Sequence, residues 1–129
     1  MKDRKQVIAV INSTIDIVDI IEICLQDEGY NTVGGLIPEF KRGQKDLVAF
    51  IEEHKPDLIV WDFAPPYEQN VNFLNMVQNM KVMEGIKWIY TTTNKAALSK
   101  FTDKIQAYEI IGKPMDLQAI VDLVKKTLA

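Results

Sequence analysis

Short β-branched runs alternate with longer segments of helical period along the chain. The short runs have the length and composition of strands, and they fall at residues 6–11, 30–35, 57–61, 86–91 and 108–112. Apolar residues recur at helical spacing in the segments 15–28, 46–54, 70–80, 95–101 and 116–128. The pattern therefore predicts strands and helices in strict alternation.

Alternation of this kind is typical of βαβ units, which build a parallel sheet. The runs at 6–11, 57–61 and 86–91 are almost continuously apolar, as in strands that are buried on both faces. The sequence therefore predicts an α/β protein with helices on both sides of its sheet.

The composition indicates one ordinary globular domain over residues 1–129. The chain is 47% hydrophobic and 26% charged with a net charge of -3, which excludes disorder and argues against direct nucleic-acid binding. No stretch approaches the roughly 18 apolar residues of a membrane span. The single cysteine, Cys24, cannot form an internal disulfide, so we expect a buried thiol in a cytoplasmic protein.

Polar side chains stand at the carboxyl ends of several predicted strands. Asn12 and Ser13 follow the first strand, Asp62 ends the third, Thr92 ends the fourth and Lys113 follows the fifth. These ends share one edge of a parallel sheet, where ligands bind in open α/β folds. We therefore expect an acid, a hydroxyl and an ammonium to meet there, although each also fits a turn, a cap or a solvated lysine.

This set of residues resembles the receiver domain of bacterial two-component response regulators, over essentially the whole chain. The resemblance rests on Asp62 with Pro66 four residues later, on Thr92 at the end of the next strand, and on the pair Lys113 and Pro114. It implies a doubly wound, flavodoxin-like five-stranded parallel sheet of order 2-1-3-4-5. It also implies a cis peptide bond before Pro114.

The resemblance implies a role in phosphorelay signalling rather than that of a true enzyme. In such domains the aspartate, here Asp62, accepts a phosphoryl group, and the hydroxyl and the lysine, here Thr92 and Lys113, hold that group by positioning and charge. The implied partner is a sensor histidine kinase or a phosphotransfer protein. By analogy alone, the surface of the fourth helix, fifth strand and fifth helix could form a homodimer.

Two departures from the family concern its metal. The acidic pair that recruits Mg²⁺ aligns with Asn12 and Ser13, so two charges are missing, and Mg²⁺ binding should weaken by several kcal/mol. Asp62, the Asn12 side chain and the Ala64 carbonyl remain as weak ligands. We expect the hydroxyls of Ser13 and Thr14 to cap the following helix instead, because the stretch STID fits a capping box.

Another departure concerns the switch position. The aromatic residue that acts with the hydroxyl of Thr92 in the family falls on Ile110, which weakens the case for an aromatic readout. Two functions stay open: a receiver phosphorylated on Asp62, and a pseudo-receiver that binds a protein partner without phosphorylation. A flavodoxin-like cofactor-binding protein is a minor alternative, because the loop after the first strand has hydroxyls but no glycine.

The connection at residues 34–45, GGLIPEFKRGQK, is predicted to be a long loop. Its residues Lys41, Arg42 and Lys45 form a small basic patch. We expect a neutral surface insertion; the alternative is a lid or partner contact that reaches over the site.

Overall fold

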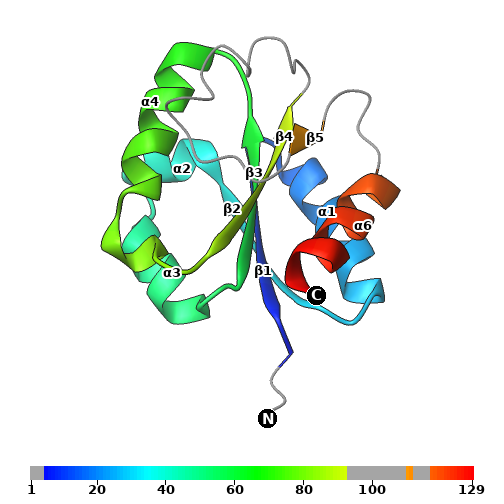
Figure 1. Cartoon of the computed structure of the whole chain (residues 1–129). Helices are drawn as coiled ribbons and strands as arrows, with labels where there is room; N and C mark the ends of the chain where they lie inside the picture. Colours follow the sequence, from blue (N-terminus) through cyan, green and yellow to red (C-terminus); the bar gives the residue numbers. More distant parts are fainter. Residues whose placement is uncertain (1–4, 93–109, 112–116) are drawn as a thin grey trace.

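The computed structural model describes residues 5–92, 110–111 and 117–129 (Figure 1). Its strands are β1 (Val7–Asn12), β2 (Asn31–Leu36), β3 (Leu58–Phe63), β4 (Lys87–Thr92) and β5 (Ile110–Ile111). Its helices are α1 (Ile15–Asp27), α2 (Ile37–Lys41), α3 (Leu47–His54), α4 (Tyr67–Gln78) and α6 (Leu117–Leu128), with a 3₁₀ turn at Lys81–Met83. The helix expected at 95–101 lies outside the described residues.

The strands form one parallel sheet in the order β2-β1-β3-β4-β5, which confirms the predicted topology. Parallel pairing brings the carboxyl ends of β1, β3 and β4 to the same edge, at the top of the view in Figure 1. This is the edge to which the sequence assigned its polar residues.

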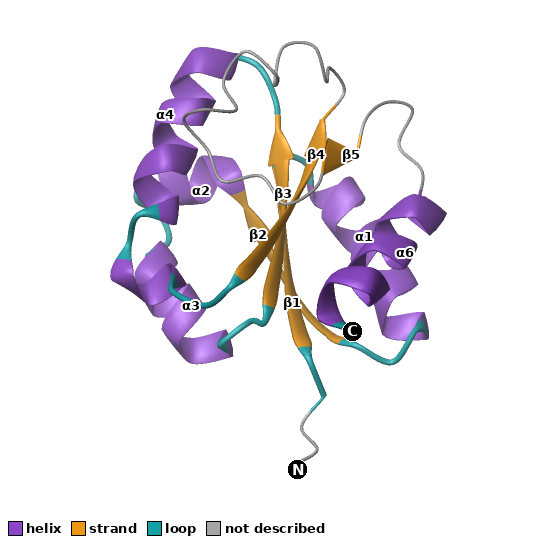
Figure 2. Cartoon of the chain, viewed as in Figure 1, coloured by secondary structure: helices purple, strands orange, loops and turns teal. Residues whose placement is uncertain are grey.

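Helices cover both faces of the sheet. Figure 2 shows α1 and α6 on one side and α2, α3 and α4 on the other. Successive side chains of a strand point to opposite faces, so Leu58 and Val60 join the core under α1 and α6, whereas Ile59 and Trp61 join the core under α2, α3 and α4. The prediction of a sheet buried on both faces is therefore confirmed.

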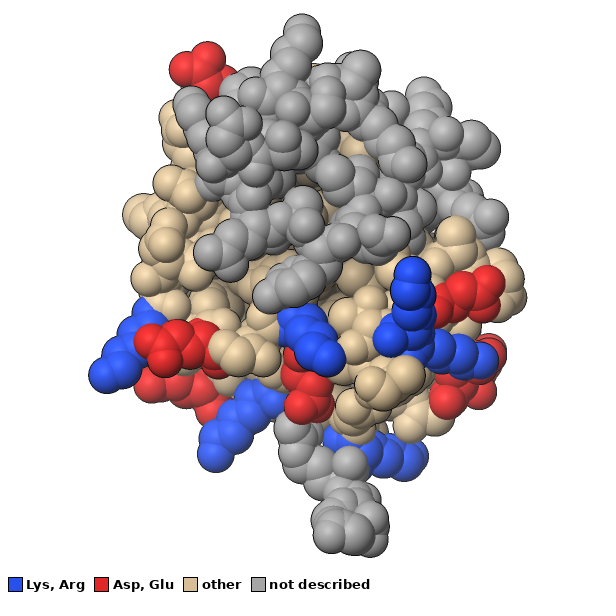
Figure 3. Space-filling view, viewed as in Figure 1, with Lys and Arg blue, Asp and Glu red and all other residues tan. Residues whose placement is uncertain are grey.

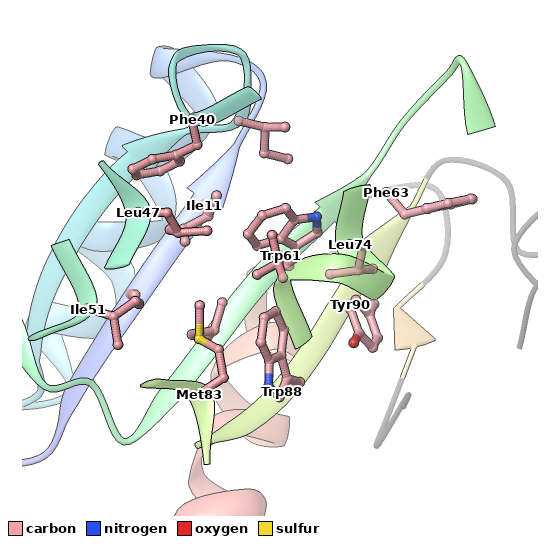
Figure 4. Close-up of a cluster of buried hydrophobic side chains, with 14 of the residues drawn as sticks. Ile11, Phe40, Leu47, Ile51, Trp61, Phe63, Leu74, Met83, Trp88 and Tyr90 are labelled. Carbon is pink, nitrogen blue, oxygen red and sulfur yellow. The ribbon is translucent and has the colours of Figure 1, made fainter. Parts of the chain in front are cut away.

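The core under α2, α3 and α4 holds most of the buried aromatic rings (Figure 4). The ring centroids of Trp61 and Trp88 are 5.8 Å apart, and those of Trp88 and Tyr90 are 6.1 Å apart. Each such ring removes about 150–250 Å² from water, so these side chains dominate the apolar burial of this face. They fix the position of β3 and β4 beneath α4.

Residues 34–45 do not form one long loop, which corrects the prediction. Strand β2 continues to Leu36, and α2 begins at the next residue, with Pro38 in its first turn, where a missing N–H costs nothing. Ile37 and Phe40 are buried in the aromatic core. The segment is therefore part of the packed structure rather than a neutral surface insertion, and a helix this short shows no readable period in the sequence.

Smaller differences from the predictions occur in α4 and α1. Helix α4 begins at Tyr67, three residues earlier than expected, directly after a cis peptide bond between Pro65 and Pro66. Cys24 on α1 is half-buried at the margin of its core rather than fully enclosed. Within the described ranges, no helix combines the length and the apolar character of a membrane-spanning segment.

Candidate functional site

Adjacent strands bring three polar side chains side by side at the carboxyl edge of the sheet. Asp62 of β3 is paired in register with Thr91 of β4. Asn12 follows Ile11, which is paired with Trp61, so Asn12 lies level with Asp62 on the other side of β3. Of the expected acid, hydroxyl and ammonium, the structure brings an acid and a hydroxyl together here, with an amide beside them, and Lys113 lies outside the described residues.

Asp62 and Thr91 are hydrogen-bonded, with the Thr91 hydroxyl donating to Asp62 Oδ1 at 2.9 Å. Asp62 is half-buried, and this burial raises the pKa of its carboxyl; the hydrogen bond from Thr91 lowers the pKa but is the smaller effect. The sheet thus presents a partly desolvated carboxyl group that is oriented by a neutral donor.

The hydroxyl bonded to Asp62 is not the one that the sequence singled out. Thr92 is buried, 4% exposed, and is paired with Phe63, one residue beyond the level of Asp62. Counting positions between motifs selects Thr92, whereas the pairing of β3 with β4 selects Thr91. Three consecutive threonines end this region of the chain, so only the register could identify the partner of Asp62.

Asn12 closes the turn into α1. Its side chain is buried, and Oδ1 accepts hydrogen bonds from the backbone N–H of Ser13 at 2.7 Å and of Thr14 at 3.2 Å. Thr14 occupies the N-cap position of α1, but its side chain makes no capping hydrogen bond. The expected capping by the hydroxyls of Ser13 and Thr14 is therefore wrong; the Asn12 carboxamide instead forms an Asx-type turn just before the helix.

The Ala64 carbonyl is also engaged. Asn70 on α4 donates from Nδ2 to this oxygen at 2.5 Å, and Asn70 Oδ1 accepts a hydrogen bond from Lys41 Nζ at 2.7 Å. The residues Lys41, Asn70 and Ala64 thus form a hydrogen-bonded chain that ties α2 to the turn after β3. The sequence did not anticipate this chain, because nothing in the pattern placed residue 41 beside residue 70.

Two of the three oxygen atoms expected to be weak Mg²⁺ ligands are engaged in protein hydrogen bonds. Mg²⁺ requires oxygen ligands in near-octahedral geometry and is usually held by one or more carboxylates. Asp62 supplies a carboxylate, but the side-chain oxygen of Asn12 and the carbonyl of Ala64 already accept hydrogen bonds from the protein. In the part of the chain that the structure describes, no cluster of three or more His, Cys, Asp or Glu residues could hold a metal ion.

Three candidate residues stay untested by the geometry. Lys113 and Pro114 lie outside the described residues, so the position of the ammonium group and the cis bond before Pro114 remain predictions. Ile110 lies in β5, where its backbone is paired with Tyr90 of β4, and its side chain also lies outside the description.

No protein-family model and no curated protein matches this sequence. Solved structures do match. The chemotaxis protein CheY4 of Vibrio cholerae is 15% identical with a TM-score of 0.75, and the match covers 95% of this chain and 98% of that chain. A CheY-like response regulator receiver domain protein from Methanospirillum hungatei is 22% identical with a TM-score of 0.75, over 97% of this chain and 94% of that chain.

The same architecture occurs in a protein with another description. A putative pilus assembly-related protein from Burkholderia pseudomallei is 13% identical with a TM-score of 0.72, and the match covers 94% of this chain and 87% of that chain. At these identities the likeness concerns the fold. The chain therefore has the fold of CheY-like response regulator receiver domains.

Proposed function

We propose that this chain is a receiver-type signalling domain whose phosphoacceptor is Asp62. The observation that carries the proposal is the place of the carboxyl group: it lies near the carboxyl end of β3 in a receiver fold, and it accepts a hydrogen bond from the hydroxyl of Thr91 at 2.9 Å. In a parallel α/β sheet this edge is where ligands bind. A sensor histidine kinase or a phosphotransfer protein is the proposed donor.

The proposed reaction is an in-line displacement at phosphorus. The Asp62 carboxylate attacks the phosphorus of a phosphohistidine, an O–P bond forms, the P–N bond breaks, and the departing imidazole takes up a proton. The residues of the chain contribute position and charge: Thr91 orients the carboxyl, and Lys113 is the proposed cation for the phosphoryl oxygens. Because burial raises the pKa of Asp62, acid should reduce the reactive carboxylate at a higher pH than in an exposed aspartate.

Mg²⁺ is proposed to contribute little. A bound divalent cation would neutralise phosphoryl oxygens, yet two of its three candidate ligands, the Asn12 side chain and the Ala64 carbonyl, already accept protein hydrogen bonds. The charge of the former acidic pair is also absent at Asn12 and Ser13.

Intact mass spectrometry tests the phosphoacceptor directly. The protein is incubated with a small phosphoramidate or acyl phosphate donor, once with Mg²⁺ and once with a chelator. We expect the protein with its original sequence to gain the mass of a phosphoryl group under both conditions, and Asp62→Asn to gain none. Asp16→Asn is the matched control, because Asp16 is an exposed aspartate on α1 and should leave the adduct unchanged.

The hydrogen bonds to the Asn12 side chain and the Ala64 carbonyl also favour a second function, in which the domain binds a protein partner without phosphorylation. If neither donor gives an adduct with or without Mg²⁺, the result contradicts phosphorylation of Asp62 and supports the alternative, a constitutive protein-interaction module of the same fold. An adduct that survives in Asp62→Asn would move the acceptor to another residue and overturn the assignment of Asp62.

A further inference from the structure

A hollow of about 440 Å³ lies between α2 and the turn that leads from β3 into α4. This volume falls within the roughly 300–1,000 Å³ of small-molecule sites. Its polar lining comes from Ser13 after β1, Lys41 and Arg42 at the end of α2, and Asn70 on α4. Asp62 is not among the lining residues, so this hollow is distinct from the row formed by Asp62 and Thr91.

The lining residues that the structure describes carry two positive charges and no acidic side chain. Lys41 and Arg42 form no ion pair with any described residue, and the nearby acid Glu39 is paired with Lys45 at 3.4 Å. Lys125, by contrast, meets Glu28 at 2.5 Å, and basic and acidic groups lie next to one another on the face drawn in Figure 3. The hollow therefore holds two adjacent cations that have no ion-pair partner among the described residues.

Part of this basic pair is held in place before any ligand arrives. Lys41 Nζ donates to Asn70 Oδ1 at 2.7 Å, and Asn70 is itself fixed by its hydrogen bond to the Ala64 carbonyl. An ammonium has three N–H donors, so two remain for a ligand. The exposed Ser13 hydroxyl makes no hydrogen bond with the described residues and can serve as a further donor.

The remaining walls are apolar and stiff. Ile37 and Pro38 line one side, and Pro65 and Pro66 line another. Proline rings have no side-chain rotamers to lose, so packing a ligand against them costs little conformational entropy. The hollow therefore combines a cationic end with a rigid apolar wall, which suits an anion that carries a hydrophobic body.

We propose that this hollow binds an organic phosphate monoester, with its phosphate between Lys41 and Arg42 and its body against Pro65 and Pro66. A monoester carries between one and two negative charges at neutral pH, which matches two uncompensated cations, and a guanidinium binds two phosphate oxygens at once. This binding goes beyond the proposed function: it is reversible, needs no metal and transfers no group to Asp62.

Isothermal titration calorimetry with phenyl phosphate tests the site. The titration uses the full chain and, in parallel, Asp62→Asn, which has no acceptor carboxylate. A chelator is present throughout. Inorganic phosphate and phenol serve as separate probes of the charged end and of the apolar wall. We expect saturable binding of phenyl phosphate to both proteins, weaker binding of inorganic phosphate, and none of phenol.

The double variant Lys41→Gln with Arg42→Gln should weaken phenyl phosphate binding at least about tenfold, because two charge-assisted hydrogen bonds are lost. The matched control is Lys55→Gln with Lys126→Gln, which removes the same charge from exposed positions outside the hollow and should leave the affinity within about twofold.

Three outcomes would overturn the proposal. These are the absence of saturable phenyl phosphate binding, equal affinities in the two double variants, and loss of binding in Asp62→Asn, which would place the anion at the Asp62 row instead. The phosphoacceptor experiment measures the mass of a covalent adduct, whereas the calorimetry measures binding heat and includes Asp62→Asn, which lacks the acceptor carboxylate. Either proposal can therefore fail while the other stands.

Discussion

Asp62 is a partly buried acid whose described partner, Thr91, is neutral. Because burial raises the pKa of this carboxyl, the folded state binds its proton more tightly than the unfolded state does. Between the unfolded pKa, near 3.8, and the higher folded pKa, stability therefore falls as pH rises. The loss of stability caused by burying the charged carboxylate is absent when the pH is below the unfolded pKa and complete when the pH is above the folded pKa.

Asp62→Asn should therefore stabilise the domain at neutral pH. An amide of the same shape keeps an oxygen for Thr91 and carries no charge to desolvate, so we expect a gain of about 1 kcal/mol, or roughly 3–6 °C in Tm. Thermal unfolding near pH 7 and near pH 3 measures the difference in Tm between Asp62→Asn and the original protein, and this difference should be smaller near pH 3. Asp16→Asn controls for loss of an exposed charge; a gain that grows toward low pH would contradict the prediction.

At the scale of single residues, the sequence predicted the position of Asp62 at the carboxyl end of its strand better than it predicted the atoms that Asp62 contacts. The place of Asp62 followed from one acid at the end of an apolar run. The partner hydroxyl did not, because Thr91 and Thr92 differ only by strand register. The turn before α1 did not either: the sequence favoured the hydroxyls of Ser13 and Thr14, whereas the Asn12 side chain accepts the hydrogen bonds in that turn.

At the scale of elements, α2 lies directly against the sheet because Gly35 has no side chain. A Cβ at Gly35 would come within 2.7 Å of Phe40 Cε2, well inside the roughly 3.5–4.0 Å at which carbon atoms make favourable contact. Phe40 is buried and cannot swing into solvent without leaving the core. The glycine therefore permits the close approach that seats α2.

Gly35→Ala should destabilise the protein by about 1–3 kcal/mol, because the added methyl displaces Phe40 and with it α2. Chemical denaturation of Gly35→Ala, Phe40→Leu and the double variant forms a double-mutant cycle. The smaller, more flexible leucine should relieve part of the overlap, so the double variant should lose less stability than the sum of the single losses. Strictly additive losses would show that the two residues do not interact in this way.

Helical period and short β-branched runs predicted the main elements, because each main element is long enough to show one of these patterns. It could not predict α2, in which only Ile37 and Phe40 face the core. Nor could it predict that the basic residues of this segment stand beside α4, since that follows from the hydrogen bond between Lys41 and Asn70. Local pattern carries no information about such contacts between distant residues.

At the scale of the whole molecule, two apolar cores share one sheet. Val124 on α6 lies in one core and Val77 on α4 in the other, and both are fully buried. Trp61 and Trp88 lie in the core that contains Val77. Because alternate residues of the same strands contribute to both cores, neither core can be lost without disturbing the other.

Val124→Ala should therefore unfold the molecule as one unit and lower its stability by about 2 kcal/mol. Tryptophan fluorescence reports the opposite face of the sheet, and far-UV circular dichroism reports all elements. We expect both signals to shift to the same lower denaturant midpoint. Val77→Ala, in the core that contains the tryptophans, is the matched control, and its two signals should also shift to one common lower midpoint. Different midpoints for the two signals in Val124→Ala would mean that the two faces of the sheet unfold independently.

Because α2 begins directly after β2, insertions and deletions of residues are restricted at this junction. No residue separates Leu36 from Ile37, and Leu36 is held in register with Asn12. One codon inserted or deleted among residues 36–40 would rotate the following helical residues by about 100°, turning Phe40 out of the core and Lys41 away from Asn70. Residues 43–45 are exposed and lie beyond the helix, so length changes should accumulate there instead.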